Sequence, residues 1–198
     1  TPAPTITIPP GGQTTAPILD RTFGQGSGQG YIALAAGSIK NATDEPDSTI
    51  ASAAQGALSF TVTPGSPDPQ VLILHTHATE TYQTWDTPVY DPDFTARTKD
   101  TTLNMCAVGE AMTKVLNDAG ITTLHDTTLH DSPSYTESYA RSAQTARRYL
   151  EEYPSIKVVL DVHRDAMESG DARVRPLTTL DGQPTAQVMI IAGCNNGG

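Results

Sequence analysis

The sequence has little cysteine, no long apolar run and few basic residues, and each shortage excludes a class of protein. Its two cysteines, Cys106 and Cys194, are too few for a disulfide-dense miniprotein or a four-cysteine zinc ribbon. No apolar run approaches the roughly 18 residues that a membrane-spanning helix needs, and no signal peptide opens the chain. An exported protein that lost its targeting segment before Thr1 would look the same.

The shortage of positive charge excludes one class of partner. The chain has 12 basic and 22 acidic residues, which gives a formal net charge of -10. Sequence-independent binding to DNA or RNA depends on basic patches that neutralise phosphates, so we expect no nucleic-acid partner. With 198 residues, 37% of them hydrophobic, the chain is long enough for one domain with a core and a smaller appendage.

The composition changes along the chain. Prolines and a glycine-rich run over residues 24–30 predict that residues 1–30 form a flexible linker. Residues 31–68 are expected to form a short β-rich extension, with strands over 31–39 and 57–62. A linker of this kind often joins a membrane anchor to a working domain, and a disordered terminus is the alternative.

From residue 69 the pattern predicts an α/β domain that runs to residue 198. Short apolar runs predict strands over 71–74, 121–124, 156–162 and 187–191. Helical spacing predicts one helix over 101–119, capped by Asp100, and another from Pro133 to Tyr153. Alternating strands and helices predict a largely parallel sheet flanked by helices, in which sites form beyond the carboxyl ends of the strands.

Two polar clusters follow predicted strands. His75, His77 and Glu80 come after the first strand, and His163 comes after the third. If those strands are neighbours, the imidazoles converge, and zinc accepts imidazole and carboxylate ligands. Buried histidines that hydrogen-bond to the backbone are the alternative.

Two other groups of chemistry-bearing residues are expected to have no catalytic role. His125 and His130, with the neighbouring Asp126 and Asp131, read as a solvated loop. Cys106 lies on the apolar side of the predicted helix and is expected in the core.

Residues 70–198 resemble the stage II sporulation protein P family of cell-wall hydrolases. The resemblance rests on a His-Thr-His-Ala-Thr-Glu stretch at 75–80 and an Asp-Val-His-Arg-Asp stretch at 161–165, within the matching segments 70–82, 104–109, 138–142 and 154–165. It implies a zinc-dependent N-acetylmuramoyl-L-alanine amidase with a fold like the broader zinc amidases. The family is also credited with endopeptidase activity on peptide cross-links.

The same resemblance implies a setting and a partner. Family members act on peptidoglycan during engulfment, anchored outside the cytoplasmic membrane. They work with a lytic transglycosylase, stage II sporulation protein D. We therefore expect an extracytoplasmic protein whose membrane anchor lies outside the present sequence.

The resemblance also implies roles for individual residues. His77 and His163 match the histidine ligands of the zinc amidases, and Glu80 belongs to the family motif. Asp100 is the rival third ligand, because it precedes a helix as the glutamate ligand of the amidases does. The remaining motif residues are expected to orient ligands or substrate: His75, Arg164 and Asp165.

One departure from the amidases concerns the general base. They carry a catalytic glutamate after the last core strand, whereas this sequence stops at residues 193–198, just after a predicted strand. We expect a domain that is truncated at its carboxyl end and therefore incomplete. The alternatives to an amidase are a non-catalytic wall-binding module of the same fold and a zinc endopeptidase.

Overall fold

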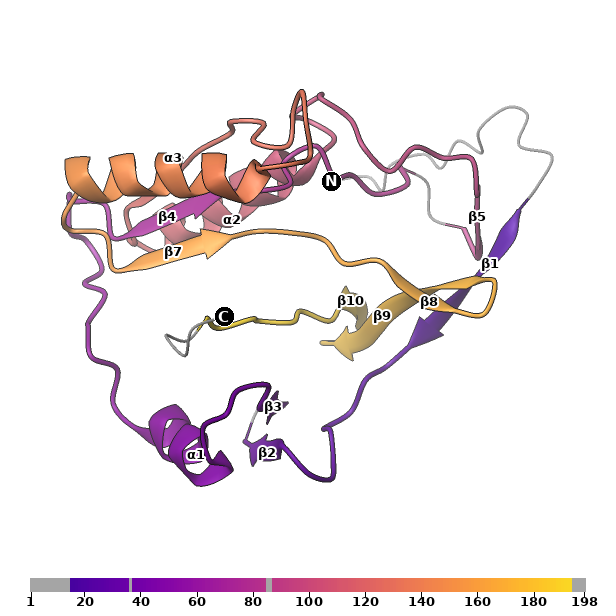
Figure 1. Ribbon diagram of the computed structural model, residues 1–198, viewed down its shortest axis with the longest axis horizontal. Coiled ribbons are helices and arrows are strands. Elements are labelled where there is room, and N and C mark those ends of the chain that lie inside the picture. The colour runs from indigo at the N-terminus through magenta and orange to yellow at the C-terminus, as the bar shows by residue number, and fades with distance from the viewer. Residues whose placement is uncertain (1–14, 36, 85–86, 194–198) are drawn as a thin grey trace. The chain divides into compact units, whose positions relative to one another are not determined.

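The structure is a computed structural model that describes residues 15–35, 37–84 and 87–193. The chain forms two compact units, the first built on residues 60–166 and the second on 17–59 and 167–193 (Figure 1). Residues 167–193 therefore belong to the second unit, although the sequence predicts that they continue the α/β domain. The first unit also contains a two-residue strand, β5 (Val89–Tyr90).

A three-stranded parallel sheet forms the centre of the first unit. Its strands are β4 (Val71–Leu74), β6 (Thr123–His125) and β7 (Val158–Asp161), arranged in the order β6-β4-β7. All four residues of β4 are buried, and Leu72 and Ile73 are 0% exposed. The central place of β4 explains why its sequence is a continuous apolar run rather than an alternating one.

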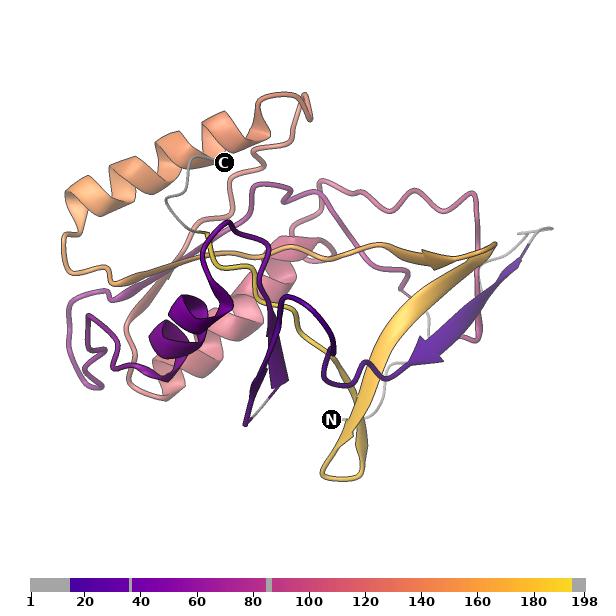
Figure 2. The same ribbon diagram turned by 60° about the horizontal axis from the view of Figure 1, so that its bottom comes forward.

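Two helices cover opposite faces of this sheet (Figures 1 and 2). Right-handed crossovers from β4 to β6 and from β6 back to β7 require this arrangement. Leu72 and Leu74 pack toward Ala146 and Tyr149 of α3 (Ser138–Glu152). On the other face, Gly109 of α2 (Met105–Asp118) lies against the histidine that follows β4. The prediction of an α/β fold with a parallel sheet flanked by helices is confirmed for this unit.

Both helices begin later than the sequence predicts. The N-cap of α2 is Asn104, whose side-chain oxygen accepts a hydrogen bond from the Cys106 N–H at 3.0 Å. The prediction that Asp100 caps this helix is wrong, because Asp100 instead accepts the Thr102 N–H in the preceding turn. Helix α3 begins at Ser138 rather than Pro133.

The second unit is mostly antiparallel. Strand β9 (Ala172–Leu180) pairs with β8 (Met167–Ser169) and β10 (Gln183–Ala186) antiparallel and with β1 (Ala16–Arg21) parallel. A separate hairpin joins β2 (Tyr31–Leu34) to β3 (Gly37–Lys40), and α1 (Asp47–Gln55) follows. The hairpin lies where the sequence predicts strand over residues 31–39.

Three sequence predictions fail in this unit. Residues 16–21 form β1, although the sequence predicts a linker there; residues 1–14 lie outside the described residues. Residues 57–62 and 187–191 form no strand, and α1 was not predicted. Val188 and Ile190 are 84% and 88% exposed, so this second apolar run does not enter a sheet.

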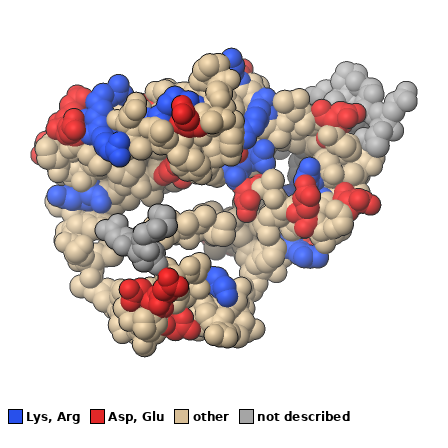
Figure 3. All heavy atoms as spheres, in the orientation of Figure 1, with Lys and Arg blue, Asp and Glu red and all other residues tan. Residues whose placement is uncertain are grey.

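Charged side chains of both signs occur together on the solvent side of α3 (Figure 3). The arginines Arg147 and Arg148 precede the acidic pair Glu151 and Glu152 along this helix. A helix with a mixed polar face and an apolar face against a sheet is the usual arrangement in α/β units. Among the described residues, none of the helices has the length and apolarity needed to cross a membrane.

Candidate metal centre

Two segments leave the parallel sheet at the same edge, directly after β4 and β7. Leu74 lies opposite Asp161 in the register of these strands, so the residues that follow them start side by side. The chain crosses from β4 to β6 and then returns past β4 to reach β7. Open α/β sheets bind their ligands at such a reversal, beyond the carboxyl ends of the strands.

A tight turn after β4 brings His77 and Glu80 together. The Glu80 N–H donates to the His77 carbonyl oxygen at 3.1 Å. As a result, Nδ1 of His77 lies 3.8 Å from Oε1 of Glu80. Both residues are buried, with exposed fractions of 6% and 9%.

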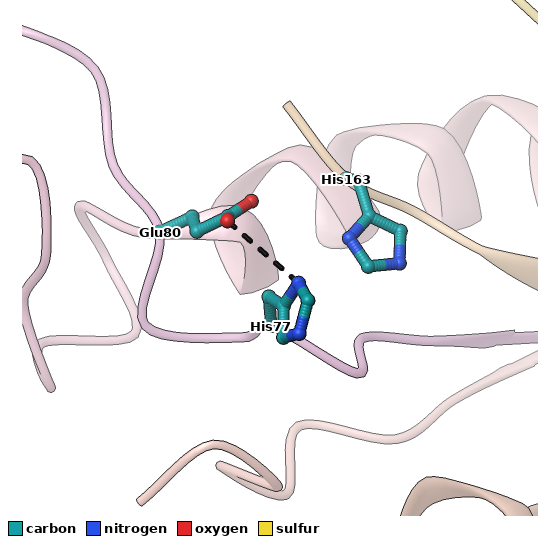
Figure 4. Close-up of side chains that lie close together, drawn as sticks. All are labelled: His77, Glu80 and His163. Carbon is teal, nitrogen blue, oxygen red and sulfur yellow. Dashed lines mark ion pairs between the residues drawn. The ribbon is translucent and has the colours of Figure 1, made fainter. Parts of the chain in front are cut away.

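His163, two residues beyond β7, completes the cluster (Figure 4). One ligand atom from each of His77, Glu80 and His163 lies within 4.8 Å of the others. The two imidazole rings are 5.0 Å apart between centroids and nearly perpendicular, at 83°. Within the part of the chain that the structure describes, no other three His, Cys, Asp or Glu side chains meet this spacing.

Two buried polar atoms in this cluster lack a hydrogen-bond partner among the described residues: Nε2 of His77 and Oε2 of Glu80. An unpaired buried polar atom costs about 1–3 kcal/mol, and such atoms are rare in folded proteins. A cation held between the three side chains would give Oε2 of Glu80 a partner, whereas Nε2 of His77 is not the ring nitrogen that faces Glu80. The donor set, two imidazoles and one carboxylate, fits a zinc ion.

Asp161 fixes the orientation of His163. Its Oδ2 accepts a hydrogen bond from Nε2 of His163 at 3.1 Å, which leaves Nδ1 as the ring nitrogen available for a metal. The Thr76 N–H and hydroxyl also donate to this carboxylate, at 2.8 and 2.7 Å. A carboxylate behind a histidine ligand is a common feature of metal sites because it fixes the tautomer.

These contacts shift the pKa values of the two residues in opposite directions. The hydrogen bond to Asp161 raises the pKa of His163 above its ordinary value, against the effect of burial. Burial alone would raise the pKa of Asp161, but the hydrogen bonds from His163 and Thr76 outweigh it and lower that pKa. For His77, burial lowers the pKa, so this imidazole is neutral at neutral pH, as a ligand must be.

Arg97 forms ion pairs with both Glu80 and Asp131. Nη2 of Arg97 lies 3.4 Å from Oε1 of Glu80, and its Nη1 lies 2.8 Å from Oδ2 of Asp131. The side chain of Asp131 is fully buried and also accepts the Thr79 N–H and hydroxyl. These bonds fix the loop between β4 and α2 that carries Glu80.

Two tyrosines border the cluster on the side of α3. Tyr135 stacks on the His77 ring with centroids 4.5 Å apart, and Tyr139 meets the same ring edge-on at 5.2 Å. Tyr139 also lies parallel to the His163 ring at 6.4 Å. Both tyrosines remain more than half exposed, at 57% and 62%. Exposed aromatic rings beside a polar centre offer a contact surface for a ligand.

His75 does not join the cluster. Its Nδ1–H donates to the Val162 carbonyl oxygen at 2.9 Å, and its Nε2 lies 3.0 Å from Nε2 of His125. Gly109 of α2 covers both rings so closely that a Cβ at this position would lie 2.4 Å from each. His75 therefore supports the backbone beside His163 from the opposite side of the sheet edge, which agrees with an indirect role.

The remaining predicted residues lie at different distances from the cluster. Arg164 donates from Nη2 to the Ala96 carbonyl oxygen at 3.4 Å, so it connects the segment after β7 to the segment that carries Arg97. Asp165 is exposed and accepts the N–H of Ala166. Asp100 is exposed in its own turn and is absent from the cluster, in which Glu80 supplies the carboxylate.

Sequence reasoning missed the residues that position the cluster. It interpreted His125, His130 and Asp131 as a solvated loop, which is wrong: His125 is part of β6, and His130 and Asp131 are buried. Their partners lie about 50 positions away, as in the Thr79–Asp131 contact, so no local spacing reveals them. Arg97 gave no sequence signal either. Asp161 was inside the family motif and adjacent to the strand end, which was the available signal.

Comparisons with known proteins identify the family of the chain. The family model for stage II sporulation protein P matches residues 32–197. Stage II sporulation protein P of Bacillus subtilis (strain 168) is 27% identical over 129 residues, which cover 62% of this chain and 30% of that protein. The chain thus spans less than a third of the length of that relative, and no solved structure matches it. The family resemblance is confirmed, and the chain belongs to the stage II sporulation protein P family.

Proposed function

We propose that this chain is part of a peptidoglycan hydrolase that cleaves the N-acetylmuramoyl-L-alanine amide bond, with zinc held by His77, Glu80 and His163. The observation that carries the proposal is the convergence of these three side chains, two of them with unpaired buried polar atoms, at the reversal point of a parallel sheet. Membership of a sporulation family points to the cell wall as the substrate.

Zinc bound by these ligands would polarise the amide carbonyl and lower the pKa of a water ligand to about 7. The chain's own residues hold the geometry. Asp161 accepts the hydrogen bond from Nε2 of His163, which leaves Nδ1 as the nitrogen that would bind the metal. Arg97 fixes the carboxylate of Glu80 from behind. Tyr135 and Tyr139 provide the exposed apolar surface on which a sugar or peptide chain can rest.

The layer arrangement of the first unit supports a fold like the zinc amidases. A parallel sheet lies between two helices, and the candidate ligands follow the carboxyl ends of two adjacent strands. Asp131 and Asp161 each accept hydrogen bonds from a threonine N–H and hydroxyl, so both carboxylates hold the segments of the site in place.

The biological setting is part of the same proposal. We place the protein outside the cytoplasmic membrane, attached through a segment outside this chain, with peptidoglycan as its substrate. Stage II sporulation protein D, a lytic transglycosylase, would act beside it. Co-purification of the two full-length proteins, with a His163→Ala variant as a control for indirect effects of activity, tests this partnership.

Digestion of purified sacculi tests the reaction. The full-length parent protein and this chain are each incubated with sacculi and zinc, and the released ends are identified by mass spectrometry. Free lactyl groups on muramic acid support the amidase. Cleaved cross-links with intact lactyl amides would show an endopeptidase, and sedimentation with sacculi without products would show a wall-binding module. His163→Ala should abolish the products, whereas Asp165→Ala, an exposed change in the same segment, should retain them.

A further inference from the structure

Arg97 contacts both Glu80 of the candidate metal centre and the buried Asp131. It lies opposite Glu80 in an isolated antiparallel bridge. The Thr98 N–H donates to the Thr79 carbonyl at 2.7 Å, and the Thr81 N–H donates to the Ala96 carbonyl at 3.1 Å. Cross-strand neighbours in such a pair have side chains within contact distance. The backbone therefore places the Arg97 guanidinium directly beside the metal centre.

The inner side of the guanidinium is anchored. Nη1 donates to Asp131 at 2.8 Å and to the Thr79 hydroxyl at 3.3 Å, and Nη2 donates to Glu80 at 3.4 Å. A guanidinium has five N–H groups. With respect to the described residues, these three bonds leave two donors, which is the number that one carboxylate accepts from an arginine. The Arg97 side chain is 40% exposed, so it is not enclosed by the protein.

Tyr135 connects this guanidinium to the metal centre. The guanidinium carbon of Arg97 lies 5.0 Å from the centroid of the Tyr135 ring. The same ring stacks on His77 at 4.5 Å. Stacking on an aromatic ring restricts an arginine side chain without using its N–H groups. Arg97 is therefore held by a ring and by hydrogen bonds, and it keeps N–H groups without a partner among the described residues.

We propose that Arg97, supported by Tyr135, is a specificity residue that binds a free carboxylate of the substrate one residue beyond the scissile amide. This inference rests on the proposed amidase function. The location agrees, because Nη2 of Arg97 contacts the same Glu80 oxygen that faces His77, so the guanidinium lies beside the cluster that would hold the scissile amide. A stem peptide in which alanine is followed by γ-linked D-glutamate carries such a carboxylate, the α-carboxylate of its second residue.

Matched substrates separate this role from a structural one. Two muropeptides are compared, one with the free α-carboxylate on the second residue and one with the corresponding amide. For the unmodified protein we expect kcat/KM to be about 10- to 100-fold higher for the free carboxylate, the range of a charge-assisted hydrogen bond. Arg97→Ala should bring this ratio close to one. Arg97→Lys, which keeps the charge but loses the fork, should give an intermediate ratio.

Two controls keep the test decisive. Arg147→Ala removes an exposed arginine in α3, outside the cluster, and should leave the ratio of the two kcat/KM values unchanged. Thermal unfolding of each variant shows whether the fold survives, and a ratio measured within one variant is independent of the fraction folded. A ratio that stays the same in Arg97→Ala, or an unmodified protein without preference, would overturn the proposal.

Binding separates the failure of this inference from the failure of the proposed function. The affinity of the two muropeptides for the full-length protein is measured by calorimetry, once for the unmodified protein loaded with zinc and once for the His163→Ala variant without zinc. A preference for the free carboxylate that disappears in Arg97→Ala supports the subsite even if neither peptide is cleaved. Cleavage of both at equal rates, with equal affinities, supports the amidase and contradicts the role of Arg97.

Discussion

His75 and His77 are the same residue type two positions apart, yet the structure uses them differently. Both ring nitrogens of His75 have partners in the protein, the Val162 carbonyl and His125. His77 keeps Nε2 buried and unpaired and turns Nδ1 toward Glu80. The comparison shows that the hydrogen-bond inventory, rather than burial, separates a supporting histidine from a candidate ligand.

The backbone explains how the two side chains separate. In an extended strand, residues two apart face the same side. Strand β4 ends at Leu74, and a turn begins at Thr76, so the alternation is broken between the two histidines. His75 stays with the α2 face under Gly109, whereas His77 moves out to the sheet edge beside His163.

The largest expected effect is the loss of zinc affinity in the His77→Ala variant. His77→Ala removes one of three protein ligands, so we expect zinc affinity to fall by more than the roughly 100-fold that loss of a supporting residue causes. Competition with a chelator of known affinity measures it. Asp165→Ala is the matched control because Asp165 is exposed and lies outside the cluster. Retention of wild-type affinity in His77→Ala would show that the cluster is not the zinc site.

A smaller effect is expected at His75. His75→Ala loses the hydrogen bond to the Val162 carbonyl, which supports the segment that carries His163. We expect zinc to remain bound with an affinity about 10- to 100-fold lower, the range of supporting residues at metal sites. The same chelator competition measures it. If His75→Ala loses the metal and His77→Ala keeps it, the roles of the two histidines are reversed.

Gly109→Ala tests the packing of α2 against His75 without substituting a histidine. The added Cβ would lie 2.4 Å from the rings of His75 and His125, so one of them must move. Overpacking of this kind costs about 1–3 kcal/mol, which exceeds the gain of at most about 1 kcal/mol from helix propensity. Chemical denaturation measures the loss. Gly24→Ala, which meets nothing within 4 Å, should change stability little. Equal stability of the two variants would contradict the contact.

Local sequence patterns predicted the first unit better than the second. The apolar run at 71–74 and the helical spacing around residues 105–118 reflect burial within one sheet and its helices. The polar residues after two strand ends then follow from parallel topology. The run at 187–191 has the same local pattern but remains exposed, because a strand needs a neighbouring strand that its own residues do not specify.

Contacts between distant segments were beyond sequence reasoning. Asp131 is held through Thr79 and Arg97, 52 and 34 positions away. The convergence of His77 and Glu80 with His163 was expected only under the condition that β4 and β7 are neighbours. The strand order β6-β4-β7 meets that condition. Arg97, like Asp131, has a neighbourhood that no local pattern indicates.

The smallest expected effect concerns Cys106, a buried side chain whose residue type also binds zinc. Burial raises the pKa of its thiol to about 11, and its Sγ lies 3.8 Å from the Thr127 carbonyl oxygen. Cys106 is absent from the cluster of candidate ligands. We therefore expect Cys106→Ala to change zinc affinity by less than about twofold, far below the supporting-residue range. A larger loss would place the thiol in the metal site.

The raised pKa also predicts how the thiol reacts. The thiolate is the reactive form, and with a pKa of about 11 only about one thiol in a thousand is ionised at pH 8, compared with roughly a quarter for an ordinary cysteine. Alkylation by iodoacetamide, measured on a Cys194→Ser variant, should be at least about 100-fold slower than that of a free peptide thiol at pH 8. The rate should rise about tenfold per pH unit toward pH 11, because deprotonation then supplies the thiolate. Fast alkylation at pH 8 would show that the Cys106 thiol is accessible to solvent. It would contradict the view that Cys106 is a buried side chain with a structural role.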